Sequence, residues 1–314
     1  MVQGSEWNEA EAVAIDGNGD GAIIVPWAAE ALQADFKRAG SDLILEAPDG
    51  KKLLIKGYFS NIELKDILTS GGAKLPAFVI DRLAGPPAPG FYAQATDSSS
   101  SVAEPIGQIT LVQGIVRIKR SDGAELVAEA GTEIFEGDVV ETKQDAAVGI
   151  EFEDKTTLSL GADARMVLDK FVYNPANNAG NLGVSVLQGA FSFVSGEVAK
   201  LSPDAMTVTT PTATIGIRGT KVAGIAAAEG ELSTISLLPE SDGSVGAIAI
   251  SNDGGSVVLT EAGSTVQLTS FNQSPPPPII LSQAEISSRF GGALNALPPS
   301  RTSDPGDNSP SDQG

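Results

Sequence analysis

The chain has 314 residues, of which 41% are hydrophobic and 19% charged, and it contains 35 Gly and 19 Pro, a composition typical of globular proteins rich in strands and turns. Its 20 basic and 40 acidic residues give a formal charge of −20, which disfavours binding to nucleic acid or to anionic lipid. Cys and His are both absent, which excludes disulfides, thiolate metal sites, histidine-ligated metals and Ser-His-Asp triads.

The sequence shows no membrane-targeting segment. Residues 1–10 lack a basic region and an apolar core, and no stretch approaches about 18 apolar residues in a row. The longest candidate, residues 215–228, is interrupted by Arg218, Lys221 and glycines. We therefore expect no membrane insertion and no recognisable Sec signal peptide, so that export would use a C-terminal signal or a larger parent chain.

Residues 1–84 are predicted to form a small α+β unit. Apolar residues at helical spacing between Trp27 and Phe36 predict a short helix just after Pro26. The apolar runs 43–45 and 53–55 flank an Asp-Gly pair and predict two strands joined by a tight turn. A second helix is expected over residues 76–83, ended by Gly85.

Residues 85–104 are rich in Pro, Gly and Ser and predict a linker. Residues 105–270 then predict an all-β domain, because short apolar runs recur between turn residues. The segment 111–116 is similar in sequence to the segment 186–191, which suggests a duplicated hairpin. The fold class is therefore mainly β, and a β-sandwich and a β-solenoid-like wrap remain equal alternatives.

The C-terminal part changes character again. Residues 271–281 read as a Pro-rich spacer, and Ser282 and Glu285 form the two ends of a capping box that starts a short helix over residues 282–291. Gly291 is the expected residue just after the end of that helix. Residues 292–314 are predicted to be a disordered acidic tail.

Three stretches carry a resemblance to a known family. They are Gly137–Thr142, Leu158–Ala164 and, most specifically, Thr210–Lys221. In this order they resemble the FecR domain family, named for the regulator of ferric citrate uptake. The resemblance implies an extracytoplasmic all-β domain used in signalling or as a module of larger exported proteins.

The sequence also differs from the FecR-type regulators in two respects. Ferric-citrate-type regulators place a segment that binds a sigma factor and one membrane helix before this domain, and neither is visible here. The N-terminal unit, with Asp42–Leu45 and its hairpin, instead resembles the head of large bacterial surface or adhesin proteins. The resemblance therefore favours an interaction module over a relay across a membrane.

The loop Asp16–Gly21 is a candidate metal site. Asp16, Asn18 and Asp20 stand at positions 1, 3 and 5, with Gly21 at position 6, as in EF-hand calcium loops. Trp27 occupies position 12, where a bidentate Glu belongs. The pattern predicts at most weak Ca²⁺ binding, and a turn without an ion is the alternative, since these residues favour turns for backbone reasons.

Residues 216–221 form the candidate interaction motif. Gly216 and Gly219 predict a bend in the backbone, beside Thr220. Arg218 and Lys221 are available to bind a carboxylate, and we expect an internal partner because the chain has 40 acidic residues.

Two charged clusters favour plainer interpretations. Arg117, Lys119 and Arg120 predict a solvated strand face or a charged edge. The carboxylates of Glu151, Glu153 and Asp154 are compatible with a glycosidase pair, but only 5% of the residues are aromatic and could line a sugar cleft.

We therefore expect a non-enzymatic module in the periplasm or at the cell surface, with a protein partner and no cofactor apart from the weak Ca²⁺ site. The alternative is a structural head segment of a type I-secreted adhesin or biofilm protein. A carbohydrate-active enzyme is the distant third hypothesis.

Overall fold

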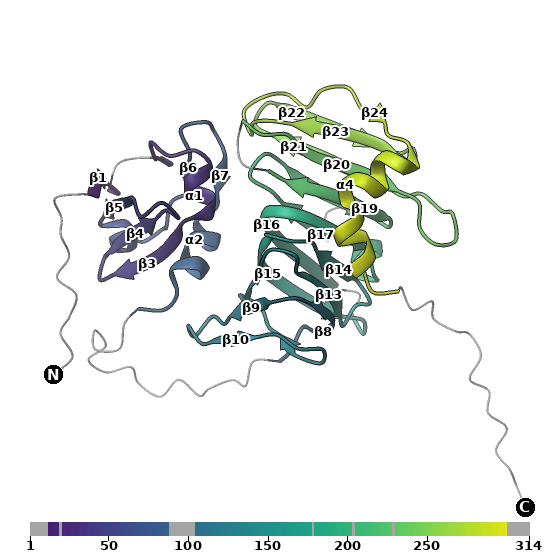
Figure 1. Ribbon diagram of the computed structural model, residues 1–314, viewed down its shortest axis with the longest axis horizontal. Helices are drawn as coiled ribbons and strands as arrows, with labels where there is room; N and C mark the ends of the chain where they lie inside the picture. The colour runs from purple at the N-terminus through teal and green to yellow at the C-terminus, as the bar shows by residue number, and fades with distance from the viewer. Residues whose placement is uncertain are drawn as a thin grey trace, which may run out of the picture.

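The computed structural model describes residues 12–18, 21–87, 104–177, 179–202, 205–227 and 230–299. Within them, residues 12–87 form one unit, here called the N-terminal unit, and residues 104–299 form a second, here called the β-domain (Figure 1). Most of the predicted linker, residues 88–103, and the tail from residue 300 lie outside the described residues. None of the described helices is long and apolar enough to span a membrane.

The N-terminal unit is a small α+β fold, as predicted. Its larger sheet has the order β1-β5-β4-β3, with β1 parallel to β5 and the other pairs antiparallel, and a second small sheet has the order β2-β6-β7. The elements are β1 (Ala12–Asp16), β2 (Ile23–Ile24), α1 (Ala29–Gln33), β3 (Asp35–Ala39), β4 (Asp42–Glu46), β5 (Lys52–Lys56), η2 (Tyr58–Ser60), β6 (Ile67–Leu68), β7 (Lys74–Leu75) and α2 (Ala77–Ala84).

The predicted hairpin is confirmed: β4 and β5 are antiparallel neighbours, and Gly50 in the turn has a φ of 85°, which glycine adopts without strain. The second helix is also confirmed, with Pro76 as N-cap and Gly85 after its last turn. The first helix is shorter than predicted. Ala34 is extended and ends α1, so that Phe36 belongs to β3, where it is paired with Leu45 and buried in the same core.

The β-domain consists of two facing sheets that share one long strand, β16. One sheet has the order β11-β8-β13-β14-β16-β19-β20-β23-β24. The other has the order β10-β9-β12-β15-β16-β17-β18-β21-β22. We call them the first and the second sheet. The domain thus has the two layers of a sandwich, while the chain advances along both sheets in one direction, as in a solenoid.

The bounds of the elements follow the apolar runs in the sequence. The elements are β8 (Gly107–Gln113), β9 (Val116–Lys119), β10 (Glu125–Val127), β11 (Glu133–Ile134), β12 (Val139–Thr142), β13 (Ala147–Phe152), β14 (Thr157–Leu160), β15 (Arg165–Asn174), β16 (Ala179–Val194), α3 (Val198–Leu201), β17 (Met206–Thr209), β18 (Thr214–Arg218), β19 (Lys221–Ala226), β20 (Ser233–Leu238), β21 (Ala247–Asn252), β22 (Gly255–Leu259), β23 (Ser264–Leu268), β24 (Ile279–Ile280) and α4 (Gln283–Ala296).

The core lies between the two sheets. Alternate residues of β18, Ile215 and Ile217, are buried from the second sheet, and Phe191 and Phe193 of β16 stack in the layer with a ring separation of 6.3 Å. Alternation along each strand sends one set of side chains inward and the other outward. Burial of these apolar side chains is the main stabilising term of the domain.

Both outer faces are partly covered. The N-terminal unit packs on the second sheet, where Val139, Val167 and Leu187 join its apolar core. Helix α4 lies across the first sheet and packs against β13, β14, β16 and β19 (Figure 1).

The C-terminal region differs from the prediction in two respects. The capping box of Ser282 and Glu285 is present, but α4 continues through Gly291 to Ala296, because Phe290, Ala293 and Ala296 are buried at helical spacing against the sheet. Residues 292–299 are therefore ordered and do not belong to a disordered tail. The predicted spacer also contains β24, which pairs with β23.

Candidate functional site

The candidate motif 216–221 forms the corner at which the chain leaves the second sheet and enters the first. Gly216 is not part of a bend, as predicted, but lies within β18, paired with Thr207 and Ala249. Gly219 does form the bend: its φ is 58°, in the left-handed region that favours glycine. We call residues 218–221 the corner.

Thr220 holds the corner in place. Its side chain is fully buried, donates to the carbonyl of Leu238 at 3.3 Å and accepts from the amide of Gly246 at 3.3 Å. Its backbone N–H donates to Oγ of Ser195 at 2.7 Å, and the Ser195 amide donates to the Thr220 carbonyl at 3.1 Å. Thr220 therefore ties β16, β20 and the loop before β21 together.

The two cations of the corner have no carboxylate partner among the described residues. Arg218 is exposed at the end of β18, and Lys221 opens β19 with its ammonium half-buried. Burial lowers the pKa of Lys221 from its ordinary value, with no compensating charge. None of the described ion pairs includes Arg218 or Lys221, so their predicted pairing with an internal carboxylate stays a prediction.

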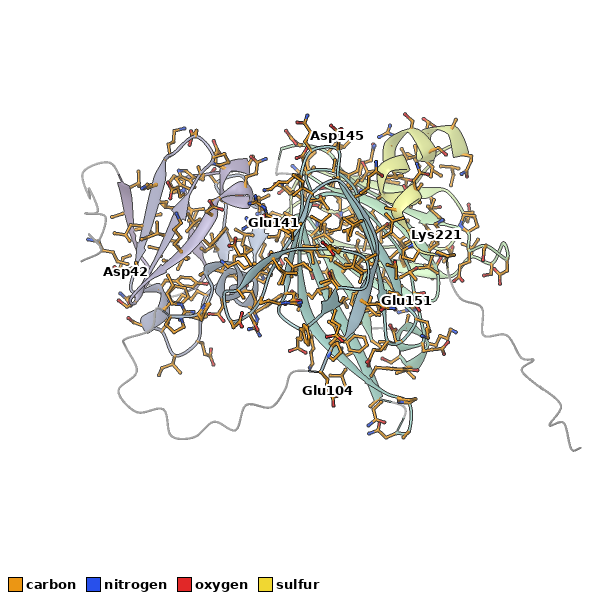
Figure 2. The ribbon with its side chains drawn as sticks, turned by 60° about the horizontal axis from the view of Figure 1, so that its bottom comes forward. Asp42, Glu104, Glu141, Asp145, Glu151 and Lys221 are labelled. Carbon is orange, nitrogen blue, oxygen red and sulfur yellow. The ribbon has the colours of Figure 1, made fainter. Side chains whose placement is uncertain are left out.

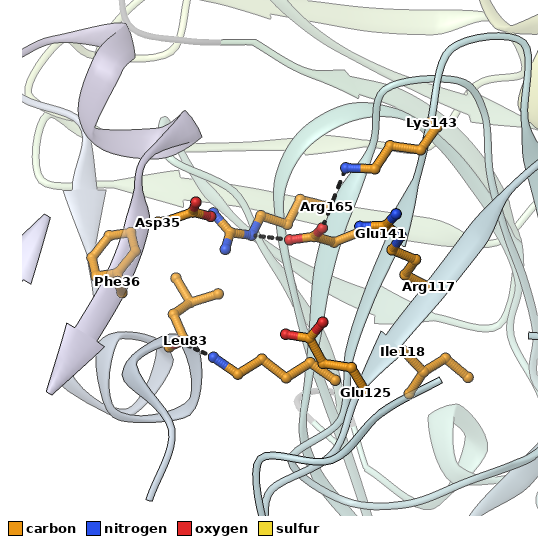
Figure 3. A pocket seen from close by; sticks show the side chains of 10 residues that line it. Asp35, Phe36, Leu83, Arg117, Ile118, Glu125, Glu141, Lys143 and Arg165 are labelled. Atoms are coloured by element: carbon orange, nitrogen blue, oxygen red, sulfur yellow. Dashed lines mark hydrogen bonds and ion pairs between the residues drawn. The ribbon is translucent and has the colours of Figure 1, made fainter. Parts of the chain in front are cut away.

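A pocket of about 300 Å³ lies at the junction of the N-terminal unit and the β-domain (Figure 3). We call it the junction pocket. Its described lining combines cations and carboxylates with three apolar side chains and contains no hydroxyl nucleophile, so it is suited to binding charged groups. It is lined by Asp35, Phe36, Leu83, Arg117, Ile118, Lys119, Glu125, Glu141, Lys143 and Arg165.

Arg165 is the central group of this pocket. Its Nε lies 2.9 Å from Oε1 of Glu141, and its Nη1 donates to the carbonyl of Ala34 in the N-terminal unit at 2.9 Å. Burial lowers the pKa of the guanidinium, and the charge of Glu141 opposes that shift. The ion pair and the carbonyl together offset the cost of removing the cation from water.

Lys119 makes the second polar contact across the junction. Its ammonium donates to the carbonyl of Leu83, at the end of α2, at 2.7 Å. Burial, followed by the charge of Arg165, lowers the pKa of Lys119. The prediction of a solvated strand face is therefore wrong for Lys119, which lies under the N-terminal unit; Arg117, on the same face, is exposed.

The remaining basic residue of that cluster, Arg120, pairs with the buried carboxylate of Asp138. Burial raises the pKa of Asp138, while the Phe135 amide and Arg120 lower it. Asp138 also accepts from the Phe135 amide at 2.8 Å. This pair therefore fixes the turn before β12 and is not a ligand site.

Thr142 links two of the stretches that carry the family resemblance. Its Oγ1 donates to the carbonyl of Gly161 at 2.6 Å and accepts from the amide of Ala164 at 2.8 Å. Thr142, Asp138 and Thr220 are thus motif residues whose buried side chains hold the fold together.

The calcium loop is only partly described. Asp16 ends β1 and is exposed; its Oδ1 accepts from both the backbone and the side-chain nitrogen of Asn18 at 2.9 Å, which lowers its pKa. Asp20 lies outside the described residues. The Ca²⁺ site therefore stays a prediction.

The acidic cluster after β13 divides into two environments. Asp154 is fully buried and accepts from Thr156 and from the amide of Val198 at 3.1 Å, so it anchors the start of α3. Glu151 and Glu153 line an open depression of about 240 Å³ instead. Asp154 is a structural residue that the sequence does not distinguish from its neighbours.

The junction pocket and the corner lie apart in the molecule. In Figure 2, Glu141 lies at the boundary with the N-terminal unit, while Lys221 lies well away from that boundary, over the β-domain. The sequence gives no signal for the pocket, since Asp35, Glu125 and Arg165 come from distant parts of the chain.

Comparison with known proteins identifies part of the β-domain. Residues 138–239 match the family model described as "FecR protein". This range contains nearly all of the three stretches discussed above, while the sheets extend beyond it on both sides. No curated protein matches the chain.

Among solved structures, two crystal structures of a candidate anti-sigma factor from Parabacteroides distasonis ATCC 8503 are similar. Each has 12% sequence identity to this chain and a TM-score of 0.37. Each match covers 48% of this chain and 63% or 62% of the other. The chain therefore spans less than two thirds of the length of these relatives.

Proposed function

Because the chain contains a FecR domain at residues 138–239, we propose that it is a non-enzymatic module that binds another protein, or senses through one, outside the cytoplasm. The observation that carries the proposal is that the corner presents Arg218 and Lys221 without an internal carboxylate partner in the described residues. In a chain of charge −20, such cations are the groups best suited to an acidic surface on a partner.

The junction pocket supports the sensing part of the proposal. The contacts between the two units include three apolar side chains of the β-domain, a backbone hydrogen bond from Lys74 to Pro211, and polar contacts from Arg165 and Lys119 to backbone carbonyls. A partner or solute that competes for these cations would change how the units are held together. Binding of such a partner or solute would thus change the position of the N-terminal unit relative to the β-domain, and this change would be the signal.

In-cell photo-crosslinking tests the proposal. A photoreactive amino acid replaces the exposed Ser244, in the loop beside the corner, in the full chain expressed in its native host. We expect an adduct with one protein, identified by mass spectrometry and recovered from the periplasmic or cell-surface fraction. The adduct is expected to fall at least fivefold in Arg218→Gln and to persist in Arg289→Gln, a matched exposed arginine on α4.

Three outcomes would contradict the proposal. They are adducts only with cytoplasmic proteins, an adduct that Arg218→Gln leaves unchanged, and turnover of a sugar polymer by the purified chain. Recovery of the chain only within a secreted surface polymer would favour the adhesin hypothesis instead.

A further inference from the structure

Strand β22 (Gly255–Leu259) is the last strand of the second sheet at the C-terminal end of the domain (Figure 1). Within the described residues it pairs with β21 alone. One side of its backbone is therefore an open sheet edge.

The register shows which backbone groups lie on this open side. The two-residue turn of Asp253 and Gly254 makes Asn252 and Gly255 the hydrogen-bonded pair that closes the hairpin. Antiparallel pairs alternate, so residues 257 and 259 also bond to β21, while the N–H and C=O groups of Ser256 and Val258 point away from it. Neither residue makes a hydrogen bond to any other described segment.

The side chains of β22 leave this edge accessible. Ser256 and Val258 are exposed, with Val258 at 56%, whereas Val257 is half-buried and Leu259 is buried at the end of the core. The strand contains no charged residue and no proline. Its edge thus lacks the features that normally prevent pairing with another strand.

Other edges of the domain do have such features. Strand β24, the matching edge of the first sheet, has only two residues and follows Pro275–Pro278, which cannot donate backbone hydrogen bonds. Strand β10 is short and begins with Glu125. The start of the proline segment lies beside the first residue of β22: Ser274 Oγ is 3.1 Å and Pro275 Cδ 3.8 Å from the ideal Cβ position of Gly255.

We propose that β22 is a strand-addition site, at which an extended segment of a partner protein pairs with Ser256 and Val258 and continues the second sheet. Its alternate residues would be apolar beside Val257 and Leu259, where they extend the core, and small or β-branched and uncharged beside Val258. A second copy of this chain is disfavoured as the occupant because both copies carry a charge of −20. This inference rests on the proposed function in that it assigns a mode of protein binding.

A phage-displayed library of random peptides, selected against the full purified chain, tests the site without knowledge of the natural partner. We expect selected peptides with alternating apolar residues. Val258→Pro removes an outward N–H without breaking the pairing with β21, so it should weaken their binding at least tenfold, whereas Val258→Thr should retain it. Val257→Pro, which removes a bond to β21, is the control for loss of folding and should lower the Tm.

Amide hydrogen exchange provides the second measurement. In the free chain the amides of Ser256 and Val258 should exchange at least tenfold faster than those of Val257 and Leu259, and a selected peptide should slow them at least tenfold. The site is ruled out if peptides bind Val258→Pro as tightly as the native chain, if no peptide is selected, or if these amides are already protected. The two proposals can fail separately. If peptides bind at this edge but crosslinking at Ser244 gives no adduct, the function proposed for the corner is rejected and the strand-addition site is retained.

Discussion

At the scale of single residues, the corner depends on Thr220, whose buried hydroxyl serves two backbone groups. Thr220→Val keeps the shape of the side chain but removes the hydroxyl that bonds the Leu238 carbonyl and the Gly246 amide. We expect a loss of about 1–3 kcal/mol in the free energy of unfolding, measured by denaturant titration. Thr207→Val, on the outer face of β17, is the control and should change stability by less than about 0.5 kcal/mol. Equal effects of the two substitutions would show that the corner is not held by Thr220.

Asp169 gives the molecule a pH dependence. It is the unpaired residue of a bulge in β15. Oγ of Ser185 donates to its Oδ2 at 2.8 Å, and its Oδ1 is buried with no hydrogen-bond partner among the described residues. Burial raises its pKa to about 7, against the smaller effects of Ser185 and Arg82. The folded state then binds a proton more tightly than the unfolded state, so this residue's contribution to stability is full below about pH 4 and is lost as pH rises to about 7.

Asp169→Asn should remove this dependence. We expect the variant to be more stable than the native chain above pH 7, by about 1–3 kcal/mol, and to lose the decline between about pH 4 and pH 7. The free energy of unfolding is measured by chemical denaturation across pH 4–8. Asp163→Asn, at an exposed position, is the control. An unchanged slope in Asp169→Asn would assign the pH dependence to other groups.

At the scale of elements, two glycines with open space around them should respond in opposite ways. Gly291 lies inside α4, and an added Cβ meets nothing within 4 Å, so Gly291→Ala should raise stability by about 0.5–1 kcal/mol. Gly219 is equally uncrowded but has a φ of 58°, so Gly219→Ala should lower stability by about 1 kcal/mol. Thermal unfolding of both variants is the measurement, and a stabilising Gly219→Ala would contradict the assigned corner geometry.

The elements also show what local sequence can predict. The hairpin of β4 and β5 and the capping box of α4 depend on neighbouring residues and were predicted correctly, and the bounds of α2 were predicted to within one residue. The end of α4 was predicted wrongly because the burial of Phe290 and Ala293 against a distant sheet outweighs the low helix propensity of Gly291. Phe36 fits a helical pattern and a strand equally well, and its pairing with Leu45 decides between them.

At the scale of the whole molecule, Arg165 connects the N-terminal unit to the β-domain. Arg165→Met should leave Glu141 and the Ala34 carbonyl without this partner and lower the stability of the junction by about 2–4 kcal/mol. We expect calorimetry to separate one thermal transition into two as the units uncouple. Lys143→Met, at the rim of the same pocket, should leave the transition unchanged, and a similar change in both variants would argue against a special role for Arg165.

The candidate sites were only partly predictable at this scale. The corner was located from its glycines and its resemblance to a family, but the environment of Arg218 and Lys221 depends on which strands surround them. The junction pocket combines residues more than a hundred positions apart, such as Asp35 and Arg165. A local sequence pattern cannot predict that such distant residues lie together. A sandwich and a solenoid-like wrap were left as equal alternatives for the same reason, since both folds contain the same strands.

The order of the strands has a consequence for how the domain is assembled. Along each sheet, every strand lies beside strands that are close to it in the chain, such as β18 beside β21 and β20 beside β23. Pairings of this kind close short loops, which favours rapid folding. A chain that emerges from a ribosome or a translocation pore from its first strand onward could add each new strand to an edge that already exists. The last edges formed would then be those at β22 and β24, so that the edge proposed for strand addition is also the last one that folding leaves exposed.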